Sequence, residues 1–121
     1  MKKALLAISL AGVFVLAGCS APFTTFEDAV STCGNPAGIT VADEGTTLTI
    51  DMMGETDYSG ADVFDIECVV DAIGTPAYVK DTIWATNALA GRQTETFDGI
   101  TVSWAYHPDN GLDAIFHYEA K

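Results

Sequence analysis

The two histidines of the chain, His107 and His117, are the side chains best suited to exchange protons near neutral pH. His107 precedes Pro108 in a segment typical of a turn, and His117 is expected on the outer face of a strand, opposite Thr101. With nearby carboxylates, the two histidines could act in a surface-tethered hydrolase or in a metal-dependent module. We keep this as the alternative to the binding function given below. The chain has no Gly-x-Ser-x-Gly sequence to mark an activated serine, so we assign no catalytic residue.

Acidic residues crowd one stretch of the chain, where their oxygens are of the kind that calcium prefers. They are Asp51, Glu55, Asp57, Asp62 and Asp65. Their spacing does not fit the EF-hand loop, and a solvated loop followed by a helix start explains them without a metal. His107 with Asp109 would supply only two ligands, whereas zinc requires three or four. We assign no metal site and no cofactor, and calcium at residues 51–65 stays an open alternative.

A binding surface is the functional interpretation that needs the fewest assumptions. Trp84, Tyr106, His107 and Asp109 combine aromatic area with polar groups, as residues that anchor protein interfaces do. The alternative for Trp84 is a structural role, since tryptophan side chains are usually largely buried.

The start of the chain has the pattern of a secretory signal. Lys2 and Lys3 precede an apolar run at residues 4–16, which is shorter than the about 20 residues of a membrane-spanning helix. The next residues, Leu16-Ala17-Gly18-Cys19, resemble the lipobox of bacterial lipoproteins at all four positions. This resemblance implies that the Cys19 thiol receives a diacylglycerol, that lipoprotein signal peptidase cuts after Gly18, and that acyl chains such as palmitate hold the product on the membrane.

We therefore expect a lipoprotein signal peptide at residues 1–18, a lipidated tether at 19–25 and a single domain at 26–121. The product would lie on the extracytoplasmic face of the cell membrane. An ordinary cleaved signal with an accidental cysteine is the alternative. With Cys19 lipidated, Cys33 and Cys68 form an even pair in an oxidising compartment, which predicts a structural disulfide.

Charge narrows the choice of partners. Residues 19–121 keep three basic side chains, Lys80, Arg92 and Lys121, against 17 acidic ones, a formal charge of −14. Such a surface repels phosphate, so we expect no nucleic acid partner. It also repels anionic lipid headgroups, so the membrane contact is expected through the acyl chains alone.

Alternation of apolar and polar residues predicts strands at 39–41, 48–52, 93–97, 100–106 and 112–118. In the first hairpin a four-residue turn puts all apolar residues on one face, and in the last hairpin a five-residue loop at 107–111 does so. Asp98-Gly99 predicts a two-residue turn. The pairs expected are Ile39 with Ile50, Val41 with Leu48, Ile100 with Tyr118, Val102 with Phe116, Trp104 with Ala114 and Tyr106 with Leu112.

The spacing of apolar residues and the cap residues in the segment 59–89 predict two helices between these hairpins. Ser59 is expected to cap the first helix, which ends at Gly74, and the second is expected to run from Pro76 to about Leu89. Their inner faces would be Val63, Ile66, Val69, Val70 and Ile73, then Tyr78, Val79, Ile83 and Leu89, with Trp84 on the other side. A short helical turn is expected at 26–31. The sum is an α+β domain, an antiparallel sheet of about five strands with two helices on one face, in the order ββααβββ.

The segments 41–48, 91–93 and 104–113 resemble a group of small, uncharacterised lipoproteins of actinobacteria, over most of the mature domain. Members often carry Asp-Gly-Arg-Gln, whereas Ala90 precedes Gly91 here. The resemblance implies the domain bounds and an envelope location, and it supplies no catalytic residues. We expect a lipid-anchored envelope protein whose small acidic domain acts as a protein- or ligand-binding module and not as an enzyme.

Overall fold

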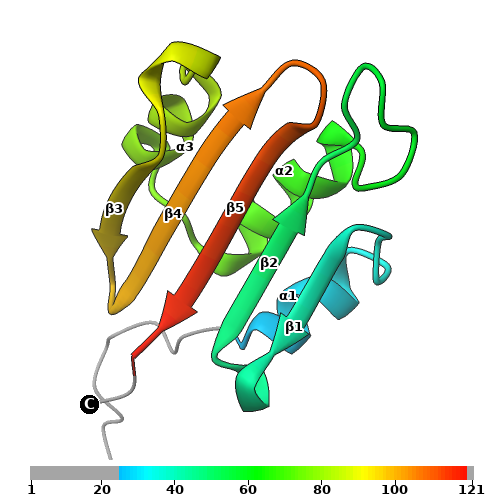
Figure 1. Ribbon diagram of the computed structural model, residues 1–121. Coiled ribbons are helices and arrows are strands. Elements are labelled where there is room, and N and C mark those ends of the chain that lie inside the picture. The colour runs from blue at the N-terminus through cyan, green and yellow to red at the C-terminus, as the bar shows by residue number, and fades with distance from the viewer. Residues whose placement is uncertain (1–24, 120–121) are drawn as a thin grey trace, which may run out of the picture.

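One antiparallel sheet with helices on a single face forms the part of the chain that the computed structural model describes, residues 25–119 (Figure 1). The expected signal peptide and the tether up to residue 24 lie outside the described residues. The strands are β1 (Ile39–Ala42), β2 (Thr47–Asp51), β3 (Gln93–Phe97), β4 (Ile100–His107) and β5 (Gly111–Tyr118). The helices are α1 (Phe26–Thr32), α2 (Val63–Ile73) and α3 (Ala77–Trp84), with short 3-10 turns η1 (Asp43–Gly45) and η2 (Ala88–Ala90). The predicted α+β class is confirmed.

The strands lie in the order β1-β2-β5-β4-β3, so the C-terminal strand is central. Every register predicted from the apolar pattern is confirmed, from Ile39 opposite Ile50 to Tyr106 opposite Leu112. The last ladder continues to His107 and Gly111, which leaves three residues in the turn instead of five. Asp98 and Gly99 both have positive φ, 48° and 79°, as a two-residue hairpin turn requires.

The core lies between the sheet and the helices, because strand side chains alternate between the two faces. Trp104, Leu48, Ile50 and Phe116 are fully buried on the helix side. The expected turn at 26–31 is a full helix, α1, which buries Phe26, Ala29 and Val30 and adds a third helix to the layer. The predicted Cys33–Cys68 disulfide is present and joins the end of α1 to the middle of α2.

The first residue of α2 differs from the prediction. Asp62, not Ser59, is the N-cap, and its carboxylate accepts a hydrogen bond from the Phe64 N–H at 2.7 Å. Ser59 is instead held in a turn, where its hydroxyl and its N–H both donate to Asp57. Asp62 and not Ser59 caps the helix, because the short Asp62 carboxylate reaches a free N–H group of the first turn of α2.

Helix α3 ends at Trp84, five residues before the predicted Leu89. The predicted inner face is therefore half wrong. Val79 and Ile83 are buried, but Tyr78 is 57% and Leu89 96% exposed. The chain turns because the Asn87 side chain caps η2, and because the Trp104 ring N–H donates to the Thr86 hydroxyl at 2.8 Å. The second of these contacts comes from β4 and is invisible to helical periodicity.

The strands run between two ends of the domain, which we call the near end and the far end (Figure 1). The near end holds Thr25, η1 and the Asp98-Gly99 turn. Its parts are in contact, since Glu27 lies against Gly45 and the Glu119 N–H donates to Gly99. The far end holds the loop at 52–62, the β4–β5 turn and the segment that joins α3 to β3.

Candidate functional site

The loop at 52–62 and the β4–β5 turn are joined by hydrogen bonds at the far end. The Glu55 N–H donates to the Pro108 carbonyl at 3.2 Å, and the Thr56 hydroxyl donates to the Asp109 carbonyl at 3.2 Å. Gly54 permits this approach, because a Cβ at that position would collide with the Asp109 carbonyl. Two segments more than 50 residues apart in the sequence therefore form one surface.

His107 and Asp109 are held together within the turn. The Asp109 N–H donates to His107 Nδ1 at 3.1 Å, whereas the Asp109 carboxylate lies 3.8 Å from the same nitrogen. The shorter contact occupies the Nδ1 lone pair, so the neutral ring carries its proton on Nε2. Both side chains are exposed, and His107 presents an N–H donor at the tip of the hairpin.

Large apolar side chains gather on this end of the molecule. Three of the exposed large hydrophobic residues among 25–119 lie in the far-end segments, namely Met53, Tyr58 and Leu89. Three more, Phe64, Trp84 and Tyr106, lie at the ends of α2, α3 and β4 that adjoin these segments. Tyr58 and Phe64 are 85% and 77% exposed. Sequence reasoning named Trp84 and Tyr106 but missed the others. Phe64 carried a usable signal, since it falls off the apolar face of α2.

The sequence predicted that Trp84 projects away from the core, but the structure places it partly against the core. With Ile83 and Lys80 it lines a small gap above the sheet, bordered by Leu112 and Phe116, and it remains 38% exposed. One part of the ring therefore packs on the core and another part meets solvent. Leu112 is also the cross-strand partner of Tyr106, so the two predicted aromatic residues flank the same leucine.

A groove that the sequence did not predict lies beside the end of α3. It has a volume of about 390 Å³ and is lined by Asp81, Thr82, Ala85, Thr86, Ala90 and Gln93. Its polar groups are largely used within the fold, since the Thr86 hydroxyl donates to the Thr82 carbonyl and the Gln93 amide donates to the Ala90 carbonyl. The groove is thus a depression whose lining includes one carboxylate, that of Asp81.

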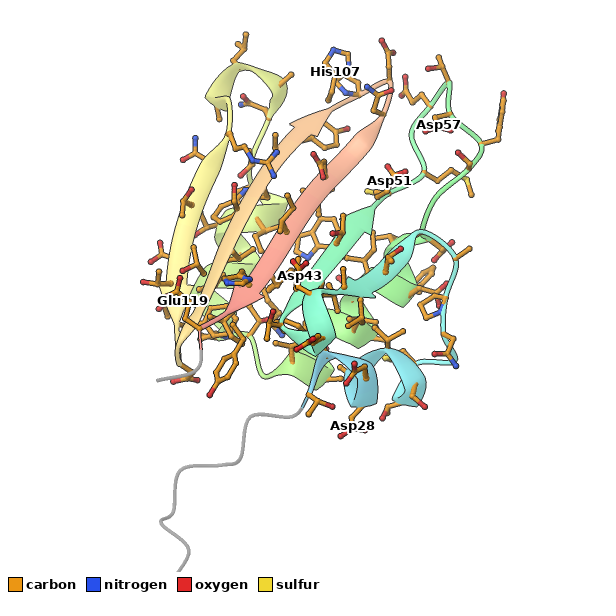
Figure 2. All side chains as sticks on the ribbon, turned by 60° about the horizontal axis from the view of Figure 1, so that its bottom comes forward. Asp28, Asp43, Asp51, Asp57, His107 and Glu119 are labelled. Carbon is orange, nitrogen blue, oxygen red and sulfur yellow. A yellow bond between two sulfur atoms is a disulfide. The ribbon has the colours of Figure 1, made fainter. Side chains whose placement is uncertain are left out.

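The two histidines do not share a site. His117 pairs with Thr101, six residues before His107 on β4, which separates the rings by about 20 Å along the sheet. Figure 2 shows His107 at the end opposite Asp28 and Glu119. His117 Nδ1 lies 3.0 Å from the Thr47 hydroxyl, which donates to Asp43 at 2.8 Å. Because that hydroxyl has one proton, the hydrogen between Thr47 and His117 belongs to the ring.

The acids of residues 51–65 do not converge either. Within residues 25–119 no group of three or more His, Cys, Asp or Glu side chains is placed to hold a metal ion. Asp62 caps α2, and Asp57 accepts two hydrogen bonds from Ser59. The Ser59 hydroxyl, followed by its N–H, lowers the pKa of Asp57 below its usual value. These acids serve local structure.

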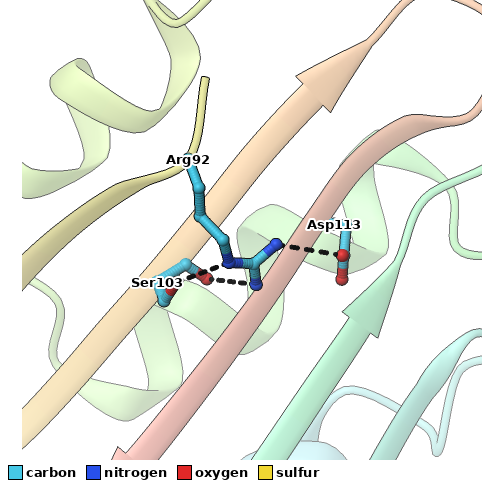
Figure 3. Close-up of polar contacts among 3 residues, drawn as sticks. All are labelled: Arg92, Ser103 and Asp113. Carbon is cyan, nitrogen blue, oxygen red and sulfur yellow. Dashed lines mark hydrogen bonds and ion pairs between the residues drawn. The ribbon is translucent and has the colours of Figure 1, made fainter. Parts of the chain in front are cut away.

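Arg92 links β4 and β5 on the face of the sheet that the helices do not cover (Figure 3). Its guanidinium crosses β4, donating to the Ser103 hydroxyl at 2.7 Å and to the Asp113 carboxylate at 3.2 Å. The ion pair is exposed and contributes little to stability, but it orients the arginine flat across the strands.

No family model, curated protein or solved structure matches the chain. Among residues 25–119, no helix is both long enough and apolar enough to cross a bilayer.

Proposed function

We propose that this chain is a lipid-anchored cell-envelope protein whose acidic domain binds a protein partner through its far end. The lipobox-like Leu16-Ala17-Gly18-Cys19 supports the anchor. The observation that carries the binding role is the gathering of exposed aromatic side chains at the end opposite Thr25. A domain tethered through Thr25 presents that end away from the membrane.

The chemistry of the far end favours a basic partner. Five acidic residues lie in the same loop as Tyr58, at the start of α2 beside Phe64, or in the β4–β5 turn: Glu55, Asp57, Asp62, Asp65 and Asp109. Aromatic rings supply contact area at low entropic cost and also attract cations over their faces. Carboxylates around them steer a positively charged surface into place, so association slows as salt rises. The braced loops at 52–62 and 108–110 keep the surface preorganised.

The binding proposal is tested with the lipidated protein in its own membranes. Chemical cross-linking should capture a specific partner with the wild type, and the capture should fall at least about tenfold in a Phe64→Ala, Trp84→Ala double variant. Tyr78→Ala is the matched control, because Tyr78 is an aromatic residue whose exposure lies between those of Phe64 and Trp84, and it lies at the start of α3, towards the near end. Equal loss in the control, or full capture by the double variant, would remove the far end from consideration.

The anchor is tested separately. Metabolic labelling with a fatty acid analogue should mark the wild type and not a Cys19→Ser variant, which should also leave the membrane fraction. A Cys19→Ser protein that is still cut after Gly18 and still bound to membranes contradicts lipid anchoring.

A further inference from the structure

Strand β1 forms one border of the sheet, and within residues 25–119 no strand pairs with its outer side (Figure 1). The Asp51 N–H donates to the Gly38 carbonyl, and this pair continues the register of β1 on β2. Because hydrogen-bonded pairs alternate along an antiparallel ladder, the backbone N–H and C=O groups of Ile39 and Val41 point away from β2. No hydrogen bond from the rest of the described chain reaches these outward groups.

A groove runs along this free edge, between β1 and α1. It has a volume of about 310 Å³ and is lined by Glu27, Val30, Asn35, Ile39, Thr40 and Val41. Three successive residues of β1 take part, although successive side chains of a strand point to opposite faces, so the groove follows the backbone edge of the strand. Its apolar side chains, Val30, Ile39 and Val41, belong to the core or pack against it.

The other border strand, β3, is protected against further pairing, and β1 is not. Glu95 of β3 lies opposite the fully buried Val102, so its charged side chain is on the helix-covered face of the sheet. An inward-pointing charge on an edge strand disfavours a further strand beside it. The segment Ile39-Thr40-Val41-Ala42 contains neither a charge nor a proline. β1 is thus the edge that accepts another strand, and its length limits that strand to a few residues.

Charge is distributed unevenly along the groove. Towards the near end of the domain there are three carboxylates, that of Glu27 in the lining and those of Asp43 and Glu44 directly after β1. Residues 33–38, at the opposite end, carry no charge. This asymmetry suits a segment with a positive charge at one end. A second copy of so acidic a domain is repelled instead.

We propose that β1 binds an extended segment of a protein partner, which adds an antiparallel strand to the border of the sheet. Ile39 and Val41 exchange backbone hydrogen bonds with this segment, and its apolar side chains fill the groove beside Val30. Antiparallel pairing places the N-terminal side of the segment towards the near end, where a Lys or Arg meets Glu27 and Glu44. This edge shares no residue with the far-end surface, so the inference does not rest on the proposed function.

The test uses the full chain in detergent micelles, with the peptide acetyl-Lys-Thr-Val-Thr-Val-amide as the probe. Its valines would lie opposite Val41 and Ile39, and its lysine beyond the end of β1. Amide hydrogen exchange at Ile39 and Val41 should slow at least about fivefold at saturating probe, because the outward N–H groups become hydrogen-bonded. Exchange at Thr94 and Thr96, which point outward on β3, should not change. No slowing on β1, or equal slowing on β3, overturns the proposal.

Two variants separate backbone pairing from charge. Val41→Pro removes an outward N–H and no ladder bond, so probe binding should weaken at least about fivefold. Thr96→Pro, at an outward position of β3, is the matched control and should leave binding unchanged. Circular dichroism checks that both variants fold.

The second variant, Glu27→Gln with Glu44→Gln, leaves the backbone of the edge intact. It should weaken binding of the lysine probe about two- to fivefold at low salt and should not affect a probe with threonine in place of lysine. Unchanged affinity for the lysine probe in this variant contradicts the assigned charge. Slow exchange at Ile39 and Val41 without any probe, at high protein concentration only, would identify a second copy as the occupant and would also overturn the proposal.

Discussion

Single polar side chains decide where the elements of this domain begin and end. Asp62 starts α2 by accepting the Phe64 N–H, and Asn87 starts η2 by accepting two N–H groups. The Thr86 hydroxyl links the end of α3 to the buried Trp104. Each of these residues satisfies backbone or ring groups that would otherwise lose their hydrogen bonds on burial.

Replacing the α2 cap tests this at the scale of one residue. Asp62→Ala should lower the free energy of unfolding by about 1 kcal/mol, because the Phe64 N–H loses its acceptor. Urea denaturation measures the change. Asp65→Ala, three residues later in the same helix, should cost clearly less. Equal effects of the two substitutions would mean that the loss comes from charge near the helix start and not from the cap.

At the scale of elements, the disulfide between α1 and α2 is expected to contribute most to the stability of the domain. The disulfide joins Cys33 after α1 to Cys68 in α2 across 35 residues of sequence, a loop that contains β1 and β2. Closing it restricts the unfolded chain. The two helices that it joins are also in contact, and Phe26 of α1 and Val69 of α2 belong to the same buried core.

Removing this link should destabilise the domain strongly. A Cys33→Ser, Cys68→Ser double variant should lose roughly 3–4 kcal/mol of unfolding free energy in the chain-entropy model. Chemical denaturation measures it, and the wild type with a reducing agent should behave alike. A loss below about 1 kcal/mol would show that the unfolded chain is already compact in this region.

The contact between the two far-end loops is a second test at the scale of elements. Gly54→Ala should cost about 1–3 kcal/mol, because the added methyl group forces the loop away from the Asp109 carbonyl. Amide chemical shifts of Asp109 and Asn110 should move with it. Unchanged shifts at the β4–β5 turn would mean that the loop yields without disturbing its partner.

At the scale of the whole molecule, net charge opposes the compact state. Residues 25–119 contain all 17 acidic residues of the chain but only two Lys or Arg side chains, both in exposed ion pairs. Repulsion among many like charges outweighs two ion pairs of this kind.

Salt should therefore stabilise the domain. Raising sodium chloride from about 10 to about 200 mM shortens the Debye length from about 30 Å to below 10 Å, so the melting temperature should rise by a few degrees. Calorimetry measures it. Potassium sulfate at matched ionic strength separates screening from salt-specific effects. A falling melting temperature would mean that the Lys80–Asp71 and Arg92–Asp113 pairs matter more than the overall repulsion.

The amino-acid sequence alone determined the α+β class, the registers within the hairpins and the disulfide pair, but not the pairing of β2 with β5. Alternation along a strand is a local property, and a shift by one residue would move every apolar side chain to the wrong face. The Asp98-Gly99 turn followed from the preference of this dipeptide for two-residue hairpins. The loop predicted at 107–111 followed from alternation and is two residues shorter in the structure.

Only the tertiary structure decided where α3 ends, how far Trp84 is buried and which loops form the far end. The Thr86–Trp104 and Thr56–Asp109 contacts join residues 18 and 53 positions apart, and no periodicity carries that information. The place of β5 at the centre of the sheet, between β2 and β4, is likewise not visible in any one strand. Strand order is set by which surfaces pack together once the chain has folded, not by the pattern within any one strand.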